Sequence, residues 1–257
     1  MKIAFFDSGI GGLSVLHHAM KILPQAEFIF YADEDNVPYG TKSPEEVLTY
    51  VDAAFQFLIA QGVEAIVVAC NTATSVAVKK MREKYSLPII GMEPAMKVAL
   101  DTFPNRKVLV TATAITITGK KIQRLIERLH AENLAELKAL PRLVEFAERQ
   151  EFNSLAVEEY LRGELNYDWE NFSSLVLGCT HFNYFKDTLR KILPPHVKIL
   201  DGNAGTVNEL IRRIEPTSSA KISSVEFFYS GRRVTDAIEL ARLEKFLRRL
   251  DEMEGLS

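Results

Sequence analysis

The stretch Ala65-Ile66-Val67-Val68-Ala69-Cys70-Asn71-Thr72-Ala73-Thr74 joins a short apolar run to residues that favour the start of a helix. A run this short and this apolar is typical of a strand buried on both faces, as in a parallel sheet. Asn71 and Thr72 are of the helix-capping types, so the pattern predicts a strand that ends, and a helix that begins, at Cys70. In open parallel sheets, ligands bind outside the carboxyl ends of the strands. A helix N-terminus also stabilises a nearby thiolate, so Cys70 stands where a functional cysteine is expected.

A second stretch, Leu175-Val176-Leu177-Gly178-Cys179-Thr180-His181, repeats the order of apolar strand, cysteine and threonine. The chain has 257 residues and only these two cysteines. A lone cysteine is usually a small buried hydrophobe. Because both cysteines stand at the predicted end of a strand, we interpret both as functional and reduced, and not as a disulfide.

The order of elements predicts the fold class. Strand-like and helix-like segments alternate from residue 2 to residue 91 and again from residue 107 to residue 200, which indicates α/β architecture with mostly parallel sheets flanked by helices. Helices are expected over about 72–85, 116–132 and 183–193, residues 43–46 give another helix an N-cap, a proline and acids at its start, and 215–220 is expected to be a loop. The chain therefore divides into two α/β halves, each with one cysteine. We expect the last strand and helix to return to the first half, which gives a discontinuous first domain, 1–94 plus 207–257, and a second domain, 95–206.

The composition excludes several classes of protein. With 47% hydrophobic and 25% charged residues, the chain has the composition of a globular protein. Its net charge of -3 shows no excess of the basic residues that bind nucleic acid. No apolar run approaches the length of a signal sequence core or a membrane span. We therefore expect a cytoplasmic protein that binds neither nucleic acid nor membrane.

The first predicted strand runs into Asp7-Ser8-Gly9-Ile10-Gly11-Gly12, a glycine-rich turn before a helix. Such a turn suits a phosphate, a substrate carboxylate, or a purely structural role. The nucleotide fingerprint G-x-G-x-x-G is incomplete, because Ser14 stands at the third glycine position; Asp33 keeps the nucleotide alternative open. Asp7 ends its strand as Cys70 does, so we expect it to face the same crevice.

Each cysteine has its own auxiliary group. Asp7 suits a role that assists a base at Cys70, and His181 lies two residues after Cys179. An enzyme with a nucleophilic cysteine pairs that one cysteine with one base, whereas here each of two cysteines has its own partner group. They indicate two acid/base groups on opposite sides of a substrate, one removing and one returning a proton, which inverts a carbon acid.

Four motifs in one order resemble the glutamate racemases of the aspartate/glutamate racemase superfamily. They are residues 7–15 (DSGIGGLSV), 37–40 (VPYG), 69–73 (ACNTA) and 177–182 (LGCTHF). The resemblance implies two pseudosymmetric domains with the active site between them. It also implies interconversion of L- and D-glutamate for peptidoglycan without metal, pyridoxal phosphate or other cofactor.

Carried over by motif, the resemblance makes Cys70 and Cys179 the catalytic bases, with Asp7 assisting Cys70 and His181 assisting Cys179. A glutamate near the second cysteine and histidine aligns best with Glu148, and Glu145 is the alternative. The implied substrate contacts are Ser8, Pro38, Tyr39, Gly40, Asn71, Thr72, Thr113, Thr116 and Thr180. The segment Asp33-Glu34-Asp35-Asn36 departs from the family by being more acidic.

The resemblance further implies a homodimer. Because the chain begins at its first strand, we expect no activation by a cell-wall nucleotide precursor. Another acidic amino acid, such as aspartate, is the alternative substrate. A cysteine-nucleophile hydrolase with one essential cysteine, a nucleotide-binding protein and a non-catalytic binding module are the alternatives from other classes.

Overall fold

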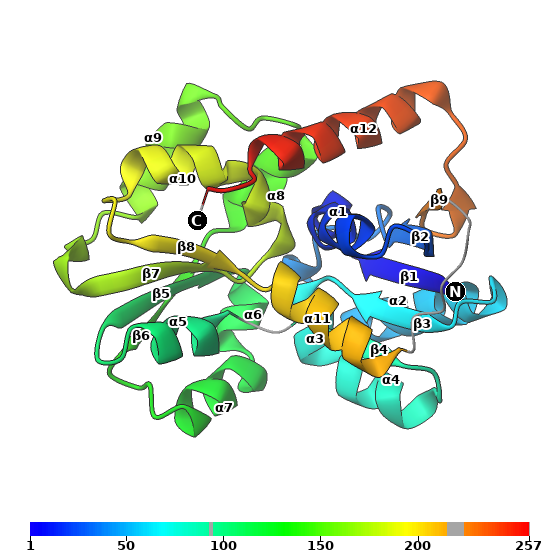
Figure 1. The fold of residues 1–257 in the computed structure, drawn as a ribbon, viewed down its shortest axis with the longest axis horizontal. Coiled ribbons are helices and arrows are strands. Elements are labelled where there is room, and N and C mark those ends of the chain that lie inside the picture. Colours follow the sequence, from blue (N-terminus) through cyan, green and yellow to red (C-terminus); the bar gives the residue numbers. More distant parts are fainter. Residues whose placement is uncertain (93–94, 215–223, 257) are drawn as a thin grey trace.

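The computed structural model describes residues 1–92, 95–214 and 224–256, which build two sheets flanked by helices (Figure 1). The first sheet has the order β10-β9-β2-β1-β3-β4 and the second the order β6-β5-β7-β8. Every neighbouring pair is parallel except β9 with β10. The predicted α/β class with mostly parallel sheets is confirmed. The strands are β1 (Lys2–Asp7), β2 (Glu27–Ala32), β3 (Ala65–Val68), β4 (Ile89–Gly91), β5 (Lys107–Ala112), β6 (Ala135–Ala139), β7 (Phe172–Leu177), β8 (Lys198–Asp201), β9 (Ser224–Tyr229) and β10 (Arg232–Arg233).

Helices cover both faces of each sheet, and several strands lead into a short 3-10 turn. The helices are α1 (Leu13–Ile22), α2 (Pro44–Ala60), α3 (Asn71–Val76), α4 (Val78–Lys84), α5 (Met96–Thr102), α6 (Ala114–Thr118), α7 (Lys120–Arg128), α8 (Pro141–Glu148), α9 (Leu155–Glu164), α10 (Lys186–Ile192), α11 (Asn203–Arg213) and α12 (Ala237–Glu252); the 3-10 turns are η1 (Ile10–Gly12), η2 (Tyr39–Thr41), η3 (Trp169–Asn171) and η4 (Thr180–Phe185).

The central strands are buried on both faces, as their apolar runs predict. All four residues of β3 and all six of β7 are buried. Because β1 pairs with β3 in parallel, with Phe6 opposite Val68, the residues that follow both strands emerge at the same edge. Asp7 and Cys70 therefore lie at one edge of the first sheet, and Cys179 lies at the corresponding edge of the second.

Three predicted helices are not continuous. The helix expected over 72–85 is α3 and α4, which meet at Ala77, and the helix expected over 116–132 is α6 and α7, which meet at Gly119. The helix expected from residue 183 begins as the 3-10 turn η4. In contrast, α2 begins as its sequence indicates, because Ser43 and Glu46 form a reciprocal capping box.

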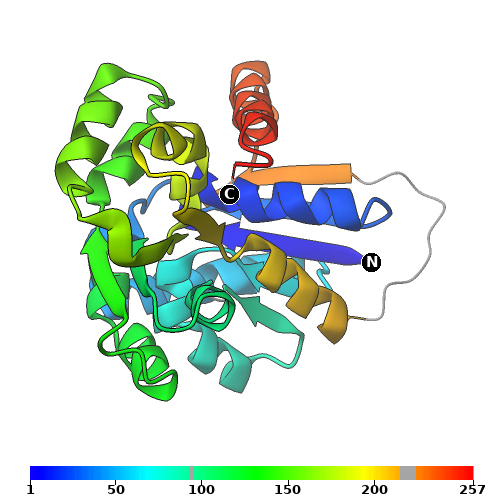
Figure 2. The same ribbon diagram turned by 60° about the vertical axis from the view of Figure 1, so that its left-hand side comes forward.

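The C-terminal segment returns to the first half. Strand β9 pairs in parallel with β2, and α11 packs on α1 and β4. Helix α12 runs along the top of the molecule and packs on both α1 and η4 (Figures 1 and 2). The predicted domain boundary between residues 206 and 207 falls inside α11, and the predicted loop 215–220 lies outside the described residues. None of the helices in the described ranges is both long and apolar enough to cross a bilayer.

Candidate active site

Cys70 is the N-cap of α3, and its side chain is almost completely buried. The backbone N–H of Ala73 donates to its Sγ at 3.4 Å, and the Ser8 hydroxyl lies 3.6 Å from the same sulfur. Ser8 also donates to Asp7 Oδ1 at 3.1 Å, so its hydroxyl stands between the thiol and the carboxyl. Burial, and then the charge of Asp7, raise the pKa of Cys70 to about 12. In this conformation Cys70 is therefore a thiol at neutral pH.

Asp7 receives hydrogen bonds from both halves of the chain. Gly9 N–H and Ser8 donate to Oδ1, and Thr180, at the start of η4, donates to Oδ2 at 2.9 Å. Burial raises the pKa of Asp7, and the charge of His181 and the three hydrogen bonds only partly offset this. Asp7 is thus poised to accept a proton, and Thr180 ties it to the second half.

Cys179 faces a histidine that is itself bound to a carboxylate. His181 Nδ1 lies 3.8 Å from Cys179 Sγ, and His181 Nε2 lies 2.6 Å from Glu148 Oε1 at the end of α8. Burial alone would lower the pKa of His181, but its hydrogen bonds to Cys179 and Glu148 raise it well above its ordinary value. The raised pKa favours the protonated ring, so His181 can take up the proton of Cys179 and return it. Of the two glutamates considered, Glu145 is exposed, and Glu148 makes this contact.

The glycine-rich turn allows close approach between the two halves. A Cβ on Gly11 would lie 2.4 Å from His181 Nδ1 and from Thr180 Oγ1, and a Cβ on Gly9 would lie 2.2 Å from Glu148 Oε1. The Ile10 N–H also donates to Glu148 Oε1 at 3.2 Å. The turn is thus covered by side chains of the second half, which removes the space that a dinucleotide pyrophosphate would need.

A cavity of about 10 Å³ lies between the two sulfurs, which is room for one water molecule at most. Twelve of the fourteen predicted site residues line it. The lining residues are Asp7, Ser8, Pro38, Tyr39, Gly40, Cys70, Asn71, Thr72, Thr113, Val144, Cys179, Thr180 and His181. Side chains from both sheets therefore converge on one closed space.

The two other predicted residues stand directly behind that lining. Glu148 contacts His181, and the Thr116 hydroxyl lies 3.0 Å from that of Thr113 and 3.3 Å from that of Thr72. Tyr39 lines the cavity, but its hydroxyl donates to Asp33 at 2.6 Å. That hydroxyl is therefore already engaged within the protein.

Three neighbours of the site did not emerge from sequence reasoning. Val144 lines the cavity one helical turn before Glu148. Arg242 of α12 lies 3.5 Å from Glu148 Oε2, and Glu34 is a half-buried carboxyl whose pKa is raised by burial and by the charge of Glu148. In the sequence, only the unusual acidity of residues 33–35 pointed to Glu34. Nothing in the sequence distinguished Arg242 from the other arginines of the amphipathic helix α12.

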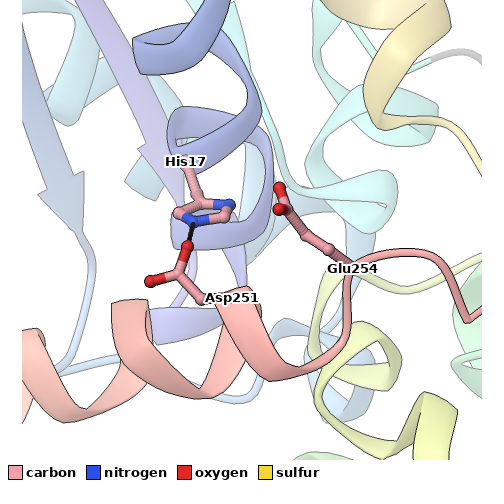
Figure 3. A group of neighbouring side chains, drawn as sticks. All are labelled: His17, Asp251 and Glu254. Atoms are coloured by element: carbon pink, nitrogen blue, oxygen red, sulfur yellow. Dashed lines mark hydrogen bonds and ion pairs between the residues drawn. The ribbon is translucent and has the colours of Figure 1, made fainter.

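One group of potential metal ligands converges within the described residues, and it is remote from the cysteines. His17, Asp251 and Glu254 bring one ligand atom each within 4.8 Å of one another, between α1 and the end of α12 (Figure 3). The Lys21 ammonium already contacts both carboxylates, at 3.1 Å for Asp251. We interpret this group as an ion-pair network that fastens α12 to α1.

Two mostly parallel sheets of an α/β fold are each followed by a buried cysteine, and both cysteines line one cavity. The chain belongs to the Asp/Glu/hydantoin racemase family, whose model matches residues 14–210.

Similar proteins cover the whole length of the chain. It is 52% identical to a glutamate racemase of Campylobacter curvus over 98% of both chains, and 40% identical to glutamate racemase 2 of Bacillus subtilis over 99% of this chain and 98% of the other. Its structure resembles that of Escherichia coli glutamate racemase in complex with L-glutamate and the activator UDP-MurNAc-Ala, with a TM-score of 0.80 and 28% identity over 97% of this chain and 94% of the other.

Proposed function

We propose that the protein is a glutamate racemase that uses Cys70 and Cys179 as its two acid/base groups. The observation that carries the proposal is that the two thiols, each with its own proton-accepting partner, line one cavity from different sheets. The glutamate racemases similar to the chain over its full length support glutamate as the substrate. Aspartate remains the alternative within the class.

The proton transfers follow from the contacts. One cysteine, as thiolate, removes the Cα proton of glutamate, and the other, as thiol, delivers a proton to the opposite face of the carbanion. Cys70 reaches its thiolate form by passing its proton through the Ser8 hydroxyl to Asp7, and Cys179 exchanges its proton with His181. Removal of the Cα proton leaves two thiols and a carbanion, and reprotonation of the carbanion leaves one thiol and one thiolate. The two cysteines have then exchanged roles, so the protein is ready to act on the opposite enantiomer.

Polar side chains of the lining suit the substrate carboxylates. Asn71 Nδ2 is buried and has no hydrogen-bond partner among the described residues, so it is available as a donor. The hydroxyls of Thr72, Thr113 and Thr180 and the backbone around Pro38, Tyr39 and Gly40 surround the same space. We assign substrate contacts to these groups and to Ser8, and we assign Thr116 the support of Thr72 and Thr113.

The cavity is too small for glutamate, so binding requires the two halves to separate and close again. The two halves correspond to the proposed domains, 1–94 plus 207–257 and 95–206, with η4 and the Thr180 contact to Asp7 at their interface. We further propose a homodimer of the cytoplasm, where free thiols stay reduced. There it would supply D-glutamate for peptidoglycan without an added cofactor.

Circular dichroism of L- and D-glutamate with the purified, EDTA-dialysed protein tests the proposal. We expect both enantiomers to reach the racemic mixture, aspartate to react more slowly, and Cys70→Ser and Cys179→Ser each to lose roughly 10³-fold or more in rate. Normal racemisation by both variants would exclude the two-thiol mechanism. A hydrolase would instead require one cysteine and form an acyl-enzyme.

A further inference from the structure

Arg242, in the C-terminal helix α12, contacts the carboxylate of Glu148, and Glu148 in turn contacts His181. Its Nη2 lies 3.5 Å from Glu148 Oε2 and donates to the Glu148 backbone carbonyl at 3.3 Å. The other carboxylate oxygen, Oε1, faces His181 Nε2 and the Ile10 N–H. Glu148 is therefore fixed through both oxygens and its main chain, with Arg242 on one side and His181 on the other.

These contacts form an unbroken chain from α12 to the second thiol. Arg242 contacts Glu148, Glu148 contacts His181 at 2.6 Å, and His181 contacts Cys179 at 3.8 Å. The side chains of Arg242, Glu148 and His181 are 22%, 17% and 3% exposed, so their interactions are weakly screened by water. No comparable connection from α12 to Cys70 appears among the described contacts.

Arg242 places a positive charge among several acidic groups that lie around Glu148. Besides Glu148 it faces Glu34, Glu239 and the Tyr229 hydroxyl, and Glu34 Oε1 is buried without a hydrogen-bond partner among the described residues. Without Arg242, the partly buried carboxyl of Glu34 would repel the carboxylate of Glu148 with no guanidinium beside them. Glu148 would also lose the contacts to its Oε2 and to its main-chain carbonyl, so it would orient His181 less firmly.

We propose that Arg242 is a positioning residue for the Cys179 half of the reaction, acting through Glu148 on His181. The proposal rests on the proposed racemase function for its kinetic consequence. It places the control of one of the two thiols on the C-terminal helix, which packs on α1 of the first half and on η4, the turn that carries His181.

The kinetic test uses Arg242→Gln and substrate deuterated at Cα. Because L- and D-glutamate have equal free energies in solution, kcat/KM must fall by the same factor in both directions, and we expect about tenfold, a part of what general acid–base catalysis contributes. The isotope effect on kcat/KM should rise in the direction in which Cys179 removes the proton, since that step becomes more limiting. It should fall in the other direction.

Two comparisons make the result specific. Cys179→Ser identifies the direction in which Cys179 acts, and Arg242→Lys, which keeps the charge, should recover part of the rate. Arg248→Gln is the matched control on the same helix, because Arg248 is 69% exposed and pairs only with Glu244 among the described contacts. Arg242→Gln with wild-type isotope effects in both directions would show a merely structural role and overturn the proposal.

A chemical readout separates this proposal from the proposed function. Alkylation of each thiol by iodoacetamide, followed by peptide mass spectrometry from pH 6 to pH 10, needs no racemase activity. We expect Arg242→Gln to shift the pH profile of Cys179 and to leave that of Cys70 unchanged. Equal shifts at both thiols, or none, would contradict the proposal, whereas an inactive wild-type protein with the expected selective shift would contradict only the racemase function.

Discussion

The hydroxyl of Thr180 donates a hydrogen bond of 2.9 Å to the Asp7 carboxylate, although 173 residues separate them in the chain. The bond joins the turn that follows the second cysteine to the strand end beside the first. The carboxyl beside the first thiol therefore depends on a residue of the second half, and in the other direction the Ile10 N–H of the first half donates to Glu148 behind His181. Closing the two halves completes both sets of contacts at once.

Thr180→Val should weaken catalysis through Asp7. Loss of the donor raises the pKa of Asp7 further, so a larger fraction of that carboxyl is protonated and unable to accept a proton at neutral pH. We expect kcat/KM to fall roughly 10- to 100-fold and the acidic limb of its pH profile to move to higher pH. Thr118→Val, on the exposed side of α6, is the control, because among the described residues the Thr118 hydroxyl bonds only to the Ala114 carbonyl. An unshifted acidic limb would exclude this role of Thr180.

Ser8→Ala should affect Cys70 selectively. The Ser8 hydroxyl lies between Cys70 and Asp7, and its hydrogen bond lowers the pKa of Cys70, so its removal raises that pKa further. We expect roughly tenfold slower racemisation and slower alkylation of Cys70 at each pH. Cys179 in the same protein is the internal control, and an equal slowing at both thiols would point to a general change of structure.

Glu34→Gln should change how stability depends on pH. Burial, and then the charge of Glu148, raise the pKa of Glu34 from 4.5 to about 7. A carboxyl with a raised pKa in the folded state binds its proton more tightly there, so its contribution to stability is lost as pH rises from 4.5 through 7. We therefore expect the Tm of the variant, relative to wild type, to increase between pH 5.5 and pH 8.

The control for this pH series is Glu83→Gln. Glu83 is 64% exposed and lies 4.0 Å from Lys79, so its pair is weak. Its Tm difference from wild type should stay flat over the same range. A Glu34→Gln difference that is equally flat would contradict a raised pKa of Glu34.

Gly11→Ala and Gly205→Ala should have opposite effects on stability. The new methyl at residue 11 would lie 2.4 Å from His181 and Thr180, and overpacking of this kind costs about 1–3 kcal/mol. At Gly205, inside α11, no described residue outside the neighbouring helix backbone comes within 4 Å of such a methyl, so alanine there should stabilise by about 1 kcal/mol through helix propensity. Urea unfolding measures both, and a neutral Gly11→Ala would refute the close approach of the two halves.

Much of the fold was predictable because buried parallel strands have a distinctive pattern. The apolar runs that form β1, β3 and β7 are buried along their length, and the capping box of α2 is local. Strand β6 was not recognised, because it is a five-residue edge strand made of Ala, Glu, Leu and Lys, residue types that favour helices, and its residues are all half-buried. The breaks at Ala77 and Gly119 also escaped prediction, because the helical pattern continues through both.

The sequence by itself determined the two strand-end cysteines, their neighbours Asp7 and His181, and the family to which the chain belongs, because these features are local in the chain. Only the tertiary structure decided which groups meet across the two halves. It brings Thr180 to Asp7, selects Glu148 over Glu145 beside His181, and sets Arg242 and Glu34 around Glu148. These contacts depend on how the two sheets and helix α12 pack together, and no single stretch of residues determines that packing.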